Sequence, residues 1–137
     1  MRESIGKLTG LDFRLGYPDH IVVSPVDENV LYMSGATTDP SKWRTSRMAD
    51  GTVMMSRDRG RNWSPSDQGL PTSKRPNIEA MCVAIWPGGF SLFVGTTDGE
   101  VYCSEDGAER WNLVASGLAP VSKVGHFRFL QAAAPAA

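Results

Sequence analysis

Chemistry on a substrate would have to come from carboxylates in this chain. The sequence has no glycine-rich phosphate loop, no G-x-S-x-G elbow and no H-E-x-x-H pair. Glycoside hydrolysis generally needs two carboxyl groups that face each other across the scissile bond. The sequence offers two possible pairs of carboxylates, Glu79 with Asp98 and Glu79 with Glu100. These three residues are the candidate catalytic groups. The sequence leaves the distance between them open.

A second set of residues suits binding rather than reaction. A polar loop at residues 37–51 places Trp43 among cations. Apolar sugar faces stack on aromatic rings, while arginine pairs with carboxylates. The candidate ligand-binding residues are Tyr17, His20, Trp43, Arg44, Arg47, Arg75 and His126. In the alternative interpretation, Trp43 anchors its own loop to a sheet and the charges only solvate the rim.

Metal ligation is not expected. His20, Glu79 and His126 could be combined into a ligand set, but no close His-x-His or Cys-x-x-Cys spacing supports it. We therefore predict neither a metal nor another cofactor.

A repeated element must position these side chains. The octad SRDRGRNW, from Ser56 to Trp63, returns as SEDGAERW, from Ser104 to Trp111, at a spacing of 48 residues. Both follow the pattern S-x-D-x-G-x-x-W, except that Ala108 replaces the glycine in the second copy. Serine and aspartate side chains accept bonds from backbone N–H groups just downstream, and the tryptophan adds a large apolar surface. The octads are therefore predicted to be rigid turns between strands.

The two octads resemble Asp-box (BNR) repeats, the turns between the third and fourth strands of blades in sialidase-type β-propellers. The resemblance implies a structural role for Ser56, Asp58, Gly60, Trp63, Ser104, Asp106 and Trp111. It also implies a ligand face at the opposite ends of the strands. Ala108 must either take another turn geometry or carry roughly 1–2 kcal/mol of left-handed strain. Phe13-Arg14-Leu15 resembles the first half of the FRIP motif, whose arginine binds substrate in sialidases, and an exposed strand arginine is the alternative.

The chain is expected to be all-β, with two four-stranded antiparallel sheets as the blades of a partial propeller or of a subunit in an oligomeric one. The strand expected at residues 20–26 is apolar enough to be buried on both faces. No segment keeps a helical period without a glycine or proline. The expected divisions are an N-terminal segment with a possible outer strand (1–17), blade one (18–71) with an inserted loop (37–51), blade two (72–118), the start of a further blade (119–131) and a flexible tail (132–137).

Composition limits the partners. The 14 basic and 15 acidic residues nearly cancel, so no overall charge attracts nucleic acid or an acidic membrane. The N-terminus lacks the apolar region of a secretory signal, which predicts a cytoplasmic protein.

Cys82 and Cys103 are expected on the first and third strands of one sheet, about 10 Å apart, as buried free thiols.

Two blades present a packing problem, because propellers typically have about four to eight blades around an axis. Two alone would leave apolar faces bare. The expected partners are therefore the remaining blades of a longer chain, or further copies of this chain in a ring of about three or four.

Two functions fit these residues. The first is a non-catalytic Asp-box β-propeller module that binds a glycan or a protein on the face opposite the Asp boxes. The alternative is part of a sialidase-like or other Asp-box glycoside hydrolase. The first is favoured, because neither a cluster of three arginines nor a Tyr-Glu nucleophile pair can be assigned.

Overall fold

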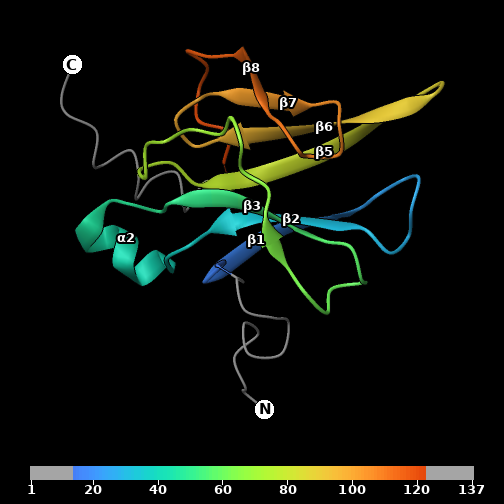
Figure 1. Ribbon diagram of the computed structural model, residues 1–137. Helices are drawn as coiled ribbons and strands as arrows, with labels where there is room; N and C mark the ends of the chain where they lie inside the picture. Colours follow the sequence, from blue (N-terminus) through green and yellow to red (C-terminus); the bar gives the residue numbers. More distant parts are fainter. Residues whose placement is uncertain (1–13, 123–137) are drawn as a thin grey trace.

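The computed structural model describes residues 14–122. Within this range the chain forms two antiparallel sheets of four strands, each with its strands in sequence order (Figure 1). The first sheet contains β1 (Tyr17–Val23), β2 (Leu31–Ala36), β3 (Gly51–Ser56) and β4 (Ser64–Pro65). The second sheet contains β5 (Ile78–Trp86), β6 (Gly89–Thr96), β7 (Val101–Ser104) and β8 (Asn112–Ala115). The expectation of an all-β chain with two four-stranded antiparallel sheets is confirmed.

Side chains alternate between two faces of each sheet, which we name front and back. The front of the first sheet carries Ile21, Val23, Leu31, Met33 and Met54, and its back carries Val22, Tyr32, Val53 and Met55. The front of the second sheet carries Met81, Val83, Leu92, Val94 and Tyr102, and its back carries Cys82, Ala84, Phe93, Val101 and Cys103.

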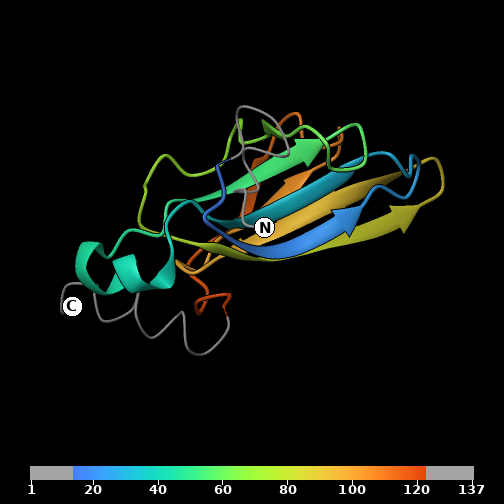
Figure 2. The same ribbon diagram turned by 90° about the horizontal axis from the view of Figure 1, so that it is seen from below.

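The back of the first sheet packs on the front of the second. Residues from these two faces form the largest cluster of buried side chains, which we call the inter-sheet core, and Trp111 belongs to it. Apolar burial of this kind is the main favourable contribution to folding. Figure 2 shows the β1–β2 and β5–β6 turns at one end of the strands and the helix α2 (Pro40–Ser46) beyond the other end.

The helix α2 corrects the expectation of a polar loop without regular structure. Asp39 caps the helix, because its Oδ1 accepts from the N–H groups of Ser41 at 3.0 Å and Lys42 at 3.3 Å. Arg47 ends it with a left-handed φ of 61°. The seven-residue helix is too short to display a helical hydrophobic period, so only the Asp-Pro start could have indicated it.

The strand register shows that the two sheets repeat one unit. Leu31 pairs with Ser56 in the first sheet, and Leu92 pairs with Ser104 in the second. The first-sheet unit is longer between its second and third strands, where it contains α2. Positions that occupy the same place in this register are called equivalent below.

Two expectations about burial are wrong. The first strand begins at Tyr17, and only one of its faces is covered, because Ile21 and Val23 are each 54% exposed. Cys82 is exposed and Cys103 is half-exposed, although both are free thiols on the expected strands. Most of the N-terminal segment 1–17, with its possible outer strand, and most of the segment 119–131 lie outside the described residues.

Candidate functional site

Hydrogen bonds from Ser56 and Asp58 organise the first octad turn. The Ser56 hydroxyl donates to Asp58 Oδ1 at 2.9 Å and accepts from the Gly60 N–H at 2.7 Å. Asp58 also accepts from the side-chain amide of Asn62 at 2.7 Å and from its backbone N–H at 2.8 Å. These bonds, the side-chain amide first, lower the pKa of the Asp58 carboxyl to about 2. The Trp63 indole N–H donates to the Gly60 carbonyl at 2.9 Å.

The second octad forms the same turn. The Ser104 hydroxyl donates to Asp106 Oδ1 at 2.8 Å and accepts from the Ala108 N–H at 2.9 Å. Asp106 accepts from the backbone N–H of Arg110 at 3.0 Å, and this bond is the main reason why the pKa of its carboxyl is lowered. Ala108 has a φ of 70°, so of the two options it keeps the turn geometry and carries the left-handed strain.

At the opposite end of the strands, Trp43 is fully buried. Its indole N–H donates to both oxygens of Thr38, at 3.1 Å and 2.9 Å. Its ring meets that of Tyr17 edge to face at 6.1 Å and packs with Ala36 and Ala49. This burial contradicts the predicted stacking of Trp43 on a sugar. The side chain instead anchors its own segment, as in the alternative interpretation.

The other predicted ligand residues are spread over separate segments. His20 is exposed on β1, and Arg47 is the half-buried cap of α2. Arg75 lies in the linker before β5, where its Nε is 3.1 Å from Asp98 Oδ1. Arg44 lies within α2, and His126 lies outside the described residues.

Two carboxylates at equivalent bulges meet on one buried amide. The bulges in β1 and β5 fall at Asp19 and Glu79. Asn77 Nδ2 donates to Asp19 Oδ2 and to Glu79 Oε1, each at 3.1 Å. The other Glu79 oxygen accepts from the Ser122 hydroxyl at 2.6 Å. This network ties the two sheets together, and sequence reasoning missed Asn77 because only its place just before a strand marked it.

The other two candidate catalytic carboxylates also have protein partners. Asp98 forms the ion pair with Arg75. Burial raises the pKa of the Tyr102 hydroxyl, and the neighbouring carboxylate of Glu100 raises it further through its charge and then through a hydrogen bond. The three carboxylates proposed as catalytic are thus each engaged by neighbouring side chains.

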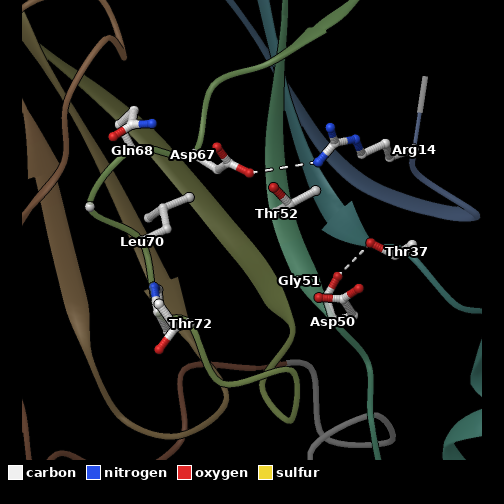
Figure 3. A pocket seen from close by; sticks show the side chains of 11 residues that line it. Arg14, Thr37, Asp50, Gly51, Thr52, Asp67, Gln68, Leu70 and Thr72 are labelled. Atoms are coloured by element: carbon white, nitrogen blue, oxygen red, sulfur yellow. Dashed lines mark hydrogen bonds and ion pairs between the residues drawn. The ribbon is translucent and has the colours of Figure 1, made fainter. Parts of the chain in front are cut away.

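A polar cavity of about 380 Å³ lies at the edge of the first sheet (Figure 3). One side is formed by the start of β3 and the other by residues 67–72, which lead toward β5. We call it the edge pocket. The side chains that give it polar character are Arg14, Thr37, Asp50, Thr52, Asp67, Gln68 and Thr72. Sequence reasoning did not predict this pocket.

Thr52 lines the edge pocket and carries a buried hydroxyl. Its side chain is buried, with 8% of the residue exposed, and its hydroxyl has no hydrogen-bond partner among the described residues. By contrast, the Thr37 hydroxyl donates to the Asp50 carbonyl at 2.7 Å, and Arg14 lies 3.9 Å from the Asp67 carboxylate. An unpaired buried hydroxyl costs about 1–3 kcal/mol. Because the Thr52 oxygen is buried, a ligand group would recover that free energy only after the atoms that cover the oxygen had moved.

The second sheet has a closed contact where the first has this pocket. There the Leu118 N–H donates to the Gly99 carbonyl at 3.1 Å. In the first sheet the equivalent residues, Leu70 and Gly51, do not bond to each other in this way. The Leu70 N–H donates to the Asp67 carbonyl at 3.0 Å, and the Gly51 N–H donates to the Pro76 carbonyl at 2.8 Å. The pocket therefore exists because the segment after β4 diverges from the start of β3.

No protein-family model matches the chain, and no curated protein matches it significantly. Within residues 14–122, no group of three or more His, Cys, Asp or Glu side chains is arranged to hold a metal ion. None of the helical structure in this range is long and apolar enough to cross a membrane.

Proposed function

We propose that the chain is a non-catalytic Asp-box β-propeller module that binds a neutral glycan in the edge pocket. The observation that supports binding most directly is the edge pocket itself, whose lining includes Thr52, a residue with a buried hydroxyl that has no hydrogen-bond partner among residues 14–122. The pocket lies toward the strand ends opposite the octad turns, where the resemblance to Asp-box propellers implies a ligand face.

The arrangement of the sheets supports the propeller proposal. Each sheet has four antiparallel strands in sequence order, a bulge in its first strand and an octad turn between its third and fourth strands. The sheets pack front on back, so the same contact could be repeated by further sheets. Radial repetition of such sheets is how propellers are built.

The lining of the edge pocket favours a neutral polyhydroxylated ligand. Sugar hydroxyls both donate and accept, and the pocket offers a guanidinium, an amide, hydroxyls and carboxylates. Asp50 and Asp67 outnumber Arg14, so the charge disfavours an anionic sugar. The volume of about 380 Å³ falls within the range of small-molecule sites and suits one or two sugar units.

The partners of the candidate catalytic carboxylates support a non-catalytic role. Glu79 is buried and accepts hydrogen bonds on both oxygens, and Asp98 is held by Arg75. A general acid or nucleophile at either position would first have to break these contacts. Neither residue lines the edge pocket.

The test combines a glycan array with calorimetry on Thr52→Val, which removes the hydroxyl but keeps the shape. Without ligand, this variant should be as stable as the wild type or more stable by up to about 1–3 kcal/mol, because an unsatisfied group is lost. Its affinity for the best neutral glycan should fall about 2- to 10-fold, the value of one hydrogen bond. Opposite changes in stability and affinity identify a binding hydroxyl.

Ser34→Ala is the matched control. The Ser34 hydroxyl is also buried and has no hydrogen-bond partner in the part of the chain that the structure describes, but it does not line the edge pocket. This variant should keep the wild-type affinity. Folded protein that binds no neutral glycan, or Thr52→Val with unchanged affinity, would refute the proposal. Hydrolysis of a neutral fluorogenic glycoside that Asp67→Asn abolishes would point to the hydrolase alternative.

A further inference from the structure

Positions that are buried inside the chain on one sheet are exposed at their equivalents on the other. Met81, on the front of the second sheet, is only 4% exposed, and Val83 packs against the inter-sheet core. Their equivalents on the front of the first sheet are Ile21 and Val23, each 54% exposed. Along β1, the front of the first sheet therefore presents apolar surface like that which the second sheet buries, whereas Met54 on β3 is already covered by a cluster with Leu15 and Trp63.

The second sheet presents the other half of the same contact. Leu70, which follows the first sheet, is 8% exposed in the inter-sheet core, whereas its equivalent Leu118 is 48% exposed. A Cβ atom added at Gly69 would lie 2.1 Å from the Trp111 carbonyl oxygen, because the second sheet abuts it. At the equivalent Gly117, an added Cβ would meet no atom within 4 Å.

We propose that copies of this chain associate head to tail, with the front of one first sheet packed on the back of the next copy's second sheet. The contact would repeat the inter-sheet core between molecules. The inference does not depend on glycan binding. Because the two surfaces differ, the contact is heterologous, and successive copies close into a ring if the rotation allows it.

The side chains of both faces fit such a contact. The front of the first sheet offers Ile21 and Val23 beside Leu31 and Met33, and the back of the second offers uncharged Cys82, Ala84, Phe93, Val101 and Cys103. Apolar surface on both faces gains free energy when removed from water. A second copy is the occupant that these observations favour, because one chain carries both complementary halves.

The first test is solution mass by light scattering over a micromolar concentration series. The wild-type chain should form a defined multimer, of about two to four copies if it closes with four to eight sheets. Ile21→Asp should shift the mass to that of one chain while the circular dichroism spectrum and the thermal transition are retained. Val26→Asp is the matched control, because Val26 is 72% exposed and lies in the β1–β2 turn beyond the end of β1, and it should leave the multimer intact.

A second test locates the contact by cross-linking. Val22 and Val83 pack against the same core, so their equivalents Cys82 and Val23 should meet between copies. In a Cys103→Ser background, Val23→Cys treated with a mild thiol oxidant should give multimers on a non-reducing gel, and Cys82→Ser should abolish them. Val26→Cys should give none with Cys82.

Each test can overturn the proposal. A wild-type chain that stays monomeric at every concentration contradicts it, as would occur if another segment or another protein covers these faces. A multimer that survives Ile21→Asp, together with no Val23–Cys82 cross-link, shows that copies associate through a different surface.

Discussion

The two octad turns share the hydrogen bonds of their serine and aspartate side chains but differ in external support. The Trp111 indole N–H donates to the Ser66 carbonyl of the first sheet at 2.8 Å, and the Ser66 hydroxyl donates back to the Ala108 carbonyl. The Trp63 indole N–H instead donates to Gly60 within its own turn, at 2.9 Å. The turn is thus a property of its eight residues, whereas its stabilisation depends on whether another sheet lies beside it.

The tryptophans provide the largest test of this difference. Trp111→Ala should cost about 4–5 kcal/mol of unfolding free energy, because the ring fills the inter-sheet core and its N–H joins the sheets. Trp63→Ala should cost about 3 kcal/mol, because its cluster with Leu15 and Met54 lies on one sheet only. Urea unfolding followed by circular dichroism measures both.

Trp86→Ala is the control for the tryptophan pair. Its side chain is partly exposed at the end of β5, so the loss should stay within about 1 kcal/mol. Equal losses for Trp63 and Trp111 would show that the neighbouring sheet adds nothing to the second turn.

The glycines after each fourth strand give the next largest difference. Both have a positive φ, 93° at Gly69 and 71° at Gly117, so alanine carries left-handed strain of about 1–2 kcal/mol at either position. At Gly69 the added Cβ would also collide with the Trp111 carbonyl. We expect Gly69→Ala to cost about 3 kcal/mol or more and Gly117→Ala only the strain. Thermal unfolding of dilute protein compares the two, and a similar cost at both would contradict the asymmetry.

The sequence was sufficient for the parts of the fold that are local. Short apolar runs separated by turn residues predicted eight strands in two sheets, and the serine and aspartate of each octad predicted the turns. Each of these features depends on residues only a few positions apart. The exposure of Ile21 was not predictable in this way, because it depends on which face of β1 another sheet covers.

The candidate site depended on contacts between distant segments, so little of it was predicted. The sequence predicts Trp43 as a ligand residue because aromatic side chains serve both stacking and anchoring, and only its burial against Tyr17 distinguishes the two roles. The edge pocket arises from the path of the linker after β4. Asn77 became significant only when the fold brought Asp19 and Glu79 to one amide.

The smallest expected difference between the turns is in their response to acid. Asp58 has a folded pKa of about 2, below its ordinary value of 3.8, and the pKa of Asp106 is also lowered. A carboxyl with a lowered folded pKa stabilises the fold above its unfolded pKa, and this stabilisation is lost as the pH falls through the folded value.

The side-chain amide of Asn62 is the largest cause of the lowered pKa at Asp58, whereas the backbone N–H of Arg110 is the largest cause at Asp106. Asn62→Ala should therefore reduce the loss of stability between pH 4 and about pH 2, while Arg110→Ala, which keeps its backbone N–H, should leave it unchanged. Urea unfolding at a series of pH values checks this, and an equal effect of the two substitutions would show that the turns hold their carboxylates in the same way.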